Sequence, residues 1–408
     1  MIDFTIFFQE QQKLLRRLSL ENKRYLYSQI NWKGRSSLII GQRGVGKTTL
    51  MLQYLKENYE LPSTKALYIS VDNPFFKNIS LYEFATDFEK YGGEVLFIDE
   101  VHKYKDWSTH IKSIYDSTEL KLVISGSSMI QIHAQEADLS RRVRLYRLAN
   151  LSFREYLAFK GVADLPFYTV DEVFENHLSI ANDILTQIKP LAHFEEYLSS
   201  GCYPFMLQDK DDYNHLLMGI VNQILEVDMP YVTNINFSQI DKVKKLVYLL
   251  STSVPLKPNI SKLSIAVEVS RPTLLEYIHY LEIGSLTNSV NQKARGYGVV
   301  SKPDKLFMYN TNLMRGISKS TDIGTQRETF FVNQIKSSLY NEPSLLDENI
   351  LLDVYGDFRV LNNYTVEIGG KNKSFKQIEN IPNSFVVADG IESGFGNKLP
   401  LWLFGFLY

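Results

Sequence analysis

The sequence has little of what marks secreted and membrane proteins. Its 408 residues include one cysteine, Cys202. A single cysteine supplies neither a disulfide framework nor a thiolate metal site, which is typical of a protein of the reducing cytoplasm. The longest apolar run, 399–408, has about half of the ~20 residues that a membrane helix needs. We therefore expect no membrane contact, and we expect this run to form a buried terminal strand.

The sequence also lacks an excess of charge of either sign. Its 44 Lys and Arg residues nearly balance its 46 Asp and Glu residues, so binding to nucleic acid or acidic lipid would need a local patch. Residues 1–4 lack the basic region of a signal peptide, which again favours the cytoplasm. A chain of this length is expected to form about two to four domains.

Three motifs of other enzyme classes are missing. The sequence has no Asn-Lys-x-Asp motif of GTPases and no His-Glu-x-x-His motif of zinc proteases, and residues 198–202 match the Leu-Ser-Gly-Gly-Gln signature of transporter ATPases only in part. The seven histidines are scattered, and we expect them to be structural or on the surface.

What the sequence does contain is a complete Gly-x-x-x-x-Gly-Lys-Thr phosphate loop at residues 41–48. In such loops the backbone N–H groups turn inward around a di- or triphosphate, the lysine reaches the β- and γ-phosphates, and the hydroxyl ligates Mg²⁺. An apolar run at 37–40 predicts a buried strand before the loop, and leucines at helical spacing in 49–56 predict a helix after it. The alternative is a chance match. We expect ATP to be bound by Gly41, Gln42, Arg43, Gly44, Val45, Gly46, Lys47, Thr48 and Thr49.

A second part of an ATP site follows at residues 95–100, where four apolar residues precede Asp99 and Glu100. In a P-loop protein this strand lies beside the phosphate loop, so Asp99 and Thr48 can hold Mg²⁺. Glu100 can then polarise the water that attacks the γ-phosphate. The alternative is a strand that ends in two solvated acids.

Two further groups are candidates for contact with the transferred phosphate. Ser127 follows the next apolar run and can touch the γ-phosphate or the attacking water, although a Ser/Gly turn is the alternative. An arginine from 141–144 can stabilise transition-state charge at a subunit edge, as arginine fingers do, although a solvated basic strand is the alternative. The candidate catalytic residues are Glu100, Lys47, Arg142 and Ser127.

The pattern along the chain predicts an α/β fold. Strand and helix signals alternate between residues 35 and 160, with unbroken apolar strands, which indicates a parallel sheet covered on both faces. A leading helix is predicted over 9–30 and mostly helices over 161–240. The order helix, helix, turn, helix, β-wing over 241–318 is that of a winged helix. The predicted segments are 1–34 (helical), 35–160 (P-loop ATPase core), 161–240 (helical), 241–318 (winged helix) and 319–408 (small α/β domain).

Several short stretches resemble those of a known family. They are Asp99–Tyr104 with Trp107, 114–116, 125–128, 138–142 and 151–157. The chain is similar there to prokaryotic AAA-type predicted ATPases that carry an uncharacterised C-terminal region with a winged helix and an endonuclease-like fold. The resemblance implies an ATP-binding core that uses Mg²⁺, and it makes Arg142 the better finger candidate.

The resemblance also implies a PD-(D/E)xK nuclease-like domain at the C-terminus. Such sites need an acid from a helix, an Asp on a strand, and Glu-x-Lys on the next strand. Glu328, Asp357 and Glu367 fall in suitable places, but Gly369 takes the lysine position and Lys371 comes two residues late. We expect a structural or recognition domain that has lost the chemistry, unless a bulge at the glycines restores the lysine.

The winged-helix segment is locally basic. Residues 236–318 hold eleven Lys and Arg against five Asp and Glu, which is the footprint that DNA binding requires. Arg271, Lys293 and Arg295 are the candidate DNA contacts. The alternative is a winged helix used for packing or protein contact.

These observations give one favoured hypothesis and two others. The favoured one is an ATPase whose turnover repositions the C-terminal modules, on DNA or on a protein partner, with oligomerisation open. The others are an ATP-gated switch with negligible turnover and an ATP-regulated DNA nuclease.

Overall fold

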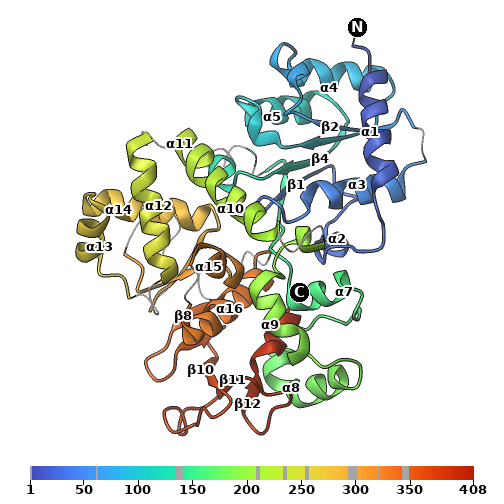
Figure 1. The fold of residues 1–408 in the computed structure, drawn as a ribbon. Coiled ribbons are helices and arrows are strands. Elements are labelled where there is room, and N and C mark those ends of the chain that lie inside the picture. Colours follow the sequence, from blue (N-terminus) through green and yellow to red (C-terminus); the bar gives the residue numbers. More distant parts are fainter. Residues whose placement is uncertain are drawn as a thin grey trace. The chain divides into compact units, whose positions relative to one another are not determined.

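The computed structural model describes residues 2–60, 63–133, 139, 141–207, 212–232, 237–252, 257–292, 302–318, 321–341 and 349–408. The chain divides into two compact units, residues 1–149 and 150–408. In Figure 1 the first unit runs from blue to teal and the second from green to red. Residues 150–160, which the sequence suggested as part of the ATPase core, belong to the second unit, where the Ser152 hydroxyl and the Arg154 guanidinium donate to the Tyr408 carbonyl oxygen.

The first unit is built on a five-stranded sheet whose pairings are all parallel, in the order β2-β3-β4-β1-β5. The strands are β1 (Ser36–Ile40), β2 (Ala66–Ser70), β3 (Val95–Asp99), β4 (Lys121–Gly126) and β5 (Arg144–Arg147). The residues of β1 and β3 are all buried, which explains their unbroken apolar runs. The predicted α/β fold with a parallel sheet is confirmed.

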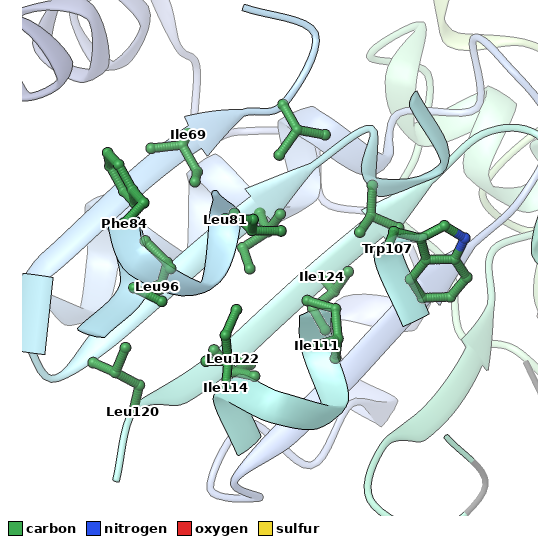
Figure 2. Close-up of a cluster of buried hydrophobic side chains, with 14 of the residues drawn as sticks. Ile69, Leu81, Phe84, Leu96, Trp107, Ile111, Ile114, Leu120, Leu122 and Ile124 are labelled. Atoms are coloured by element: carbon green, nitrogen blue, oxygen red, sulfur yellow. The ribbon is translucent and has the colours of Figure 1, made fainter. Parts of the chain in front are cut away.

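Helices cover this sheet. They are α1 (Thr5–Arg17), α2 (Leu26–Gln29), α3 (Lys47–Asn58), α4 (Leu81–Lys90), α5 (Trp107–Ser117) and α6 (Met129–His133), with 3₁₀ turns η1 (Pro74–Lys77) and η2 (Val101–Lys103). Figure 2 shows side chains of α4 and α5 pointing into one cluster with alternate residues of the strands: Leu81, Phe84, Ile111, Ile114, Ile69, Leu96, Leu122 and Ile124. This cluster fixes the strands whose carboxyl ends carry the candidate site.

The predicted leading helix over 9–30 is wrong in its limits. The chain forms α1 from Thr5 to Arg17 and leaves helical geometry at Leu18. The break has a physical reason, because Arg24 turns inward and donates to the carbonyl oxygens of Val45 and Ala149. A continuous helix would not deliver this buried guanidinium to the phosphate loop.

The second unit begins with helices and 3₁₀ turns, as the pattern over 161–240 predicts. They are α7 (Phe153–Phe159), α8 (Val170–Leu185), α9 (Leu191–Ser200), η4 (Pro204–Leu207), α10 (Tyr213–Gln223), the π-helical turn η5 (Ile224–Asp228) and α11 (Met229–Val232). Next come α12 (Phe237–Thr252), α13 (Ile260–Val267), α14 (Arg271–Ile283) and the antiparallel pair β6 (Thr287–Val290) and β7 (Lys305–Met308). Ser270 caps α14 as expected, accepting from the Thr273 backbone N–H.

A mixed sheet forms the last part of the second unit, in the order β12-β11-β10-β9-β8. It is preceded by α15 (Thr311–Ile317) and α16 (Ile323–Ser338), and its strands are β8 (Ile350–Leu352), β9 (Phe358–Val360), β10 (Tyr364–Gly370), β11 (Ser384–Asp389) and β12 (Lys398–Pro400). β8, β9 and β10 pair antiparallel, whereas β10, β11 and β12 pair parallel.

The predicted terminal strand over 399–408 is wrong for most of its length. Only β12 is extended, and Leu401–Phe406 is a buried 3₁₀ helix. Pro400 ends the strand because it has no N–H to give to a ladder. Across the described segments, no helix has the length and apolarity that crossing a membrane requires.

Candidate nucleotide site

The phosphate loop connects β1 to α3 and is shaped by its glycines. Gly44 and Gly46 have φ of 78° and 97°, a region that residues with a side chain disfavour. A Cβ on Gly41 would lie 2.4 Å from the Leu148 carbonyl oxygen, so only glycine fits there. The predicted strand, loop and helix are therefore all present, with Thr49 exposed in the first turn of α3.

Lys47 places an almost fully buried ammonium inside this loop. Its Nζ donates to the carbonyl oxygens of Gly41 at 2.8 Å and Gln42 at 3.0 Å. Burial lowers the pKa of Lys47 to about 8, and the negative charges of Glu100 and Asp99 oppose this shift. A buried cation held by neutral carbonyls is well matched to a polyanion such as a triphosphate.

Asp99, at the end of β3, is a buried carboxylate fixed by donors from four directions. Its Oδ2 accepts from the Thr48 hydroxyl at 2.7 Å and from the Tyr68 hydroxyl at 2.7 Å. Its Oδ1 accepts from the Ser125 hydroxyl and from the Glu100 backbone N–H at 3.1 Å. The Thr48 and Asp99 oxygens thus meet as hard oxygen donors of the kind that Mg²⁺ prefers.

The strand that carries Asp99 is not the neighbour of the phosphate-loop strand. β4 lies between them, pairing with β1 on one side and β3 on the other. The expectation that the Asp99 strand lies directly beside the phosphate-loop strand is thus wrong, because one strand separates β3 from β1. The Thr48–Asp99 contact forms nonetheless, because the carboxyl ends of parallel strands meet at one edge of the sheet.

Glu100 sits in strained backbone geometry at the same edge. Its φ of 55° and ψ of 37° are left-handed, a conformation that costs a residue with a side chain about 1–2 kcal/mol. Its Oε1 accepts from the Ser127 hydroxyl at 2.8 Å, and its Oε2 lies 3.3 Å from His102 Nδ1. Strain of this kind is concentrated at functional sites, and Ser127 is placed against the candidate base.

His102 joins Glu100 to the phosphate loop. Its buried ring contacts Arg43 Nη2 through Nε2 at 3.3 Å, and the Ser127 backbone N–H lies 3.4 Å from Nδ1. Burial, followed by the positive charges of Arg43 and Lys47, lowers the pKa of His102 to about 3. The imidazole is therefore neutral at physiological pH.

Arg142, the candidate finger, is engaged within the same unit. Its Nε and Nη2 donate to the two carboxylate oxygens of Asp116 at 2.8 and 2.9 Å. This bidentate pair lies at the surface, since about a quarter of the Arg142 side chain and half of the Asp116 side chain are exposed. The finger role stays a prediction, and it would require Arg142 to leave Asp116.

Sequence reasoning missed four residues of this site. Tyr68 and Ser125 contact Asp99, and Arg24 supports the loop through Val45. Neither spacing nor residue type linked these distant positions to the loop. The signal for His102 was available in the Asp-Glu-x-His order, but the residue was expected to be structural or on the surface.

The acidic candidates of the second unit also come together. Burial raises the pKa of Glu328 of α16 and of Glu367 of β10, and the negative charge of Asp357, which precedes β9, adds a smaller contribution to both. Glu328 is paired with Lys305 at 2.6 Å, and Glu367 is paired with Lys373. No cluster of three or more His, Cys, Asp or Glu side chains suited to a metal ion occurs among the described residues.

The lysine that pairs with Glu367 is Lys373. The sequence offered Lys371 for this position. Lys371 is exposed and lines a surface pocket of about 410 Å³, whereas Lys373 reaches the carboxylate. A Cβ on Gly369 would lie 2.7 Å from the Lys373 side chain. Lys373 thus fills the space that a side chain at 369 would occupy, because the chain turns back after Gly370 and Lys373 N–H donates to the Gly370 carbonyl.

The candidate DNA contacts are only partly described. Arg271 lines a surface cavity of about 530 Å³ together with Lys257, Lys302 and Asn259. Lys293 and Arg295 lie outside the described residues.

Two parts of the chain match known protein families. Residues 33–157 match the family model of an AAA domain. These residues are an AAA-type ATPase core. They cover most of the first unit and the first eight residues of the second, 150–157. Residues 191–322 match a domain of unknown function (DUF8612), which assigns no role to that part of the chain.

Individual relatives are distant. A Methanocaldococcus jannaschii protein described as uncharacterised is 25% identical over 290 residues, which are 66% of this chain and 61% of that protein. The Walker-type ATPase of Pyrococcus abyssi is 13% identical, covers 78% of this chain and 96% of its own, and has a TM-score of 0.37. AMPPCP-bound DnaA from Aquifex aeolicus is 13% identical over 69% of this chain and 89% of its own, with a TM-score of 0.22.

Nucleotide and Mg²⁺ fit the residues of the AAA core. The buried ammonium of Lys47 lies within the phosphate loop, against the carbonyl oxygens of Gly41 and Gln42, where a phosphate would meet a positive charge. The Thr48 hydroxyl and the Asp99 carboxylate supply hard oxygen atoms at 2.7 Å from one another. The donor set is thus the one that a magnesium-bound triphosphate requires.

Proposed function

We propose that this protein is an ATPase that binds Mg·ATP in its AAA core and hydrolyses it with Glu100 as general base. The observation that carries the proposal is the meeting of Thr48, Asp99 and Glu100 at the carboxyl edge of the sheet, next to the buried ammonium of Lys47. We further propose that turnover repositions the modules of the second unit.

Each residue has a distinct task in this mechanism. The loop N–H groups and Lys47 would bind the phosphates, and Thr48 and Asp99 would hold Mg²⁺, which would supply positive charge to the phosphate oxygens. Glu100 orients the attacking water and accepts its proton at a carboxylate oxygen. Ser127, now hydrogen bonded to Glu100, positions that carboxylate.

Two substitutions test the assignment. Lys47→Ala should abolish binding of a fluorescent ATP analogue, whereas the same change at exposed Lys90 should not alter it. Glu100→Gln should bind the analogue and lose about 100-fold or more of its turnover, since the charge that accepts the proton is gone. Undiminished turnover in Glu100→Gln would remove Glu100 from the mechanism.

A second candidate function is phosphate-backbone binding by the second unit, with α12, α13, α14, β6 and β7 acting as a winged helix. The cavity beside Arg271 and Lys257 favours it, because none of its eight lining residues is acidic and basic surfaces bind the nucleic-acid backbone. Steady-state ATP turnover should then rise with duplex DNA in the wild type and not in Arg271→Glu. DNA-independent turnover with no DNA binding at low salt would favour a protein partner.

For the C-terminal region we propose an endonuclease-like domain without nuclease activity. Lys305 and Lys373 pair with Glu328 and Glu367, so two of the three carboxylates that would hold a metal are already neutralised. Incubation of duplex DNA with Mg²⁺ or Mn²⁺ should give no cutting. Cutting that is lost in both Asp357→Ala and Glu367→Ala would overturn this proposal.

A further inference from the structure

Tyr68 brings a second hydroxyl group to the carboxylate oxygen that contacts the phosphate loop. Its phenol donates to Asp99 Oδ2 at 2.7 Å, and the Thr48 hydroxyl donates to the same oxygen at 2.7 Å. Tyr68 is buried. Burial, followed by the negative charge of Asp99, raises the pKa of the phenol above its ordinary value of 10. The hydroxyl therefore keeps its proton and stays a donor at physiological pH.

The register of the sheet places Tyr68 at this oxygen. In the parallel pairing of β2 with β3, Ser70 is the partner of Asp99. Tyr68 comes two residues before Ser70 and therefore lies on the same face of the sheet as Asp99. Ile69, between the two residues of β2, points to the opposite face, into the apolar cluster of Figure 2. The phenol thus reaches the carboxylate from the neighbouring strand.

A buried glutamine fixes the backbone that carries this phenol. β2 is an edge strand, and β3 pairs with it on one side. On the other side the Gln11 side chain of α1 accepts from the Tyr68 backbone N–H at 2.6 Å and donates to the Ala66 carbonyl oxygen at 3.4 Å. Gln11 is 1% exposed. Its amide takes the place of a neighbouring strand, so the backbone at Tyr68 is held on both sides.

Four donors fix a torsion of Asp99 that is soft in an isolated aspartate. The terminal χ2 torsion of aspartate has a broad energy minimum, so a carboxylate with few donors can rotate. The hydroxyls of Thr48 and Tyr68 donate to Oδ2. The Ser125 hydroxyl and the Glu100 backbone N–H donate to Oδ1. Because these donors are neutral, they fix the carboxylate and leave its charge in place.

We propose that Tyr68 is a positioning residue for Mg²⁺, because its hydroxyl holds Asp99 Oδ2 against the hydroxyl of Thr48. This proposal rests on the ATPase function proposed above and adds a residue to its metal site. A hydroxyl that donates its hydrogen to a carboxylate keeps its two lone pairs for a cation. Thr48 and Asp99 can therefore hold Mg²⁺ together while Oδ2 stays in place. Without the phenol, Oδ2 loses one of its two hydroxyl donors, and the carboxylate gains freedom to rotate.

The contribution of the metal can be measured without turnover. The affinity of a fluorescent, non-hydrolysable ATP analogue is measured with saturating Mg²⁺ and again in EDTA. By linkage, the ratio of the two affinities, here called the Mg²⁺ ratio, reports how tightly the bound analogue and the protein hold Mg²⁺. Loss of a residue that orients a metal ligand commonly costs about 10-fold or more in metal affinity, so Tyr68→Phe should lower the Mg²⁺ ratio by about 10-fold. Affinity in EDTA should not change, because Lys47 and the loop are intact.

Tyr146→Phe is the matched control. Tyr146 is a buried tyrosine of β5, the opposite edge strand of the same sheet, and its hydroxyl accepts from the Asn31 backbone N–H at 2.9 Å. This variant also loses one phenol hydroxyl and a hydrogen bond, and its Mg²⁺ ratio should equal that of the wild type. If Tyr68 had a merely structural role, both variants would lower the urea midpoint and neither would change the Mg²⁺ ratio.

A double variant tests whether Tyr68 acts through Asp99. In an Asp99→Asn background, Tyr68→Phe should not lower the Mg²⁺ ratio further, because the carboxylate that the phenol positions is absent. A wild-type protein without Mg²⁺-dependent analogue binding would overturn the proposed function together with this inference. A Mg²⁺ ratio that falls in Asp99→Asn but not in Tyr68→Phe would overturn the role of Tyr68 alone, and so would an equal effect of Tyr68→Phe with and without Asp99.

Discussion

The two units each gather buried carboxylates, but they satisfy them with different partners. In the AAA core, hydroxyl groups of Thr48, Tyr68 and Ser125 donate to Asp99. In the second unit, the ammonium groups of Lys305 and Lys373 pair with Glu328 and Glu367. Hydroxyl donors leave the negative charge in place, whereas an ammonium cancels it.

This difference decides what each site is suited to do. A carboxylate that keeps its charge among neutral donors attracts a divalent cation. A carboxylate already paired with a lysine holds the fold together and gains nothing from a metal ion. Lys305 is further fixed between the Phe307 and Phe358 rings, with Nζ 5.3 and 5.4 Å from their centroids. We therefore call the site around Asp99 in the AAA core the open site. We call the site around Glu328 and Glu367 in the second unit the closed site.

The largest effect should come from removing the charge at the open site. Asp99→Asn keeps the size of the side chain but removes the charge that would hold Mg²⁺. We expect ATP turnover to fall by about 100-fold or more and the Mg²⁺ concentration needed for analogue binding to rise. Asp87→Asn, a change at a surface residue of α4 that faces Lys90, is the matched control. Unchanged Mg²⁺ dependence in Asp99→Asn would place the metal elsewhere.

A smaller but clear effect should follow from opening the closed site. Lys305→Met leaves the Glu328 charge buried without its partner, which should cost about 3 kcal/mol of unfolding free energy. Urea unfolding followed by the fluorescence of buried Trp402 measures it. Adding Glu328→Gln should recover most of the loss, and Lys65→Met, at an exposed pair with Glu94, should have no measurable effect. If the double variant is as unstable as Lys305→Met, packing by the lysine stem is what matters.

The contrast also shows what could be predicted from the sequence. The phosphate loop, the strand before Asp99 and the parallel sheet follow from local spacing and apolar runs. The partners of Asp99 do not, because Tyr68 and Ser125 come from other strands and only the sheet order β2-β3-β4 brings them there. Lys373 was missed for a similar reason, since counting along an ideal strand cannot foresee that the chain turns back over Gly369. The predicted leading helix failed because the inward turn of Arg24 is a tertiary contact.

Lys373 and Lys371, two positions apart, allow a finer test of which lysine stabilises the closed site. Lys373→Ala removes the partner of buried Glu367 and should lower the unfolding free energy by roughly 1 kcal/mol, the side chain being about one third exposed. Lys371→Ala changes an exposed side chain and should leave stability unaltered. The urea midpoints of the two variants measure the difference. Equal midpoints would mean that Lys373 does not neutralise Glu367 in solution.

The smallest effect concerns pH. Burial raises the pKa of both Glu328 and Glu367 above the ordinary 4.5, although Lys305 and Lys373 oppose the shift. A carboxyl group whose folded-state pKa is raised stabilises the fold most at low pH, and this contribution is lost as pH rises through the folded-state pKa. The double variant Glu328→Gln with Glu367→Gln mimics the protonated form at every pH. The urea midpoint of the wild type should therefore rise relative to that of the double variant as the pH falls from 7 toward 4.5. Glu392→Gln, at an exposed position, is the control, and its midpoint should follow that of the wild type at every pH. A wild-type midpoint that falls relative to that of the double variant on acidification would mean that the lysines outweigh burial and lower the two pKa values.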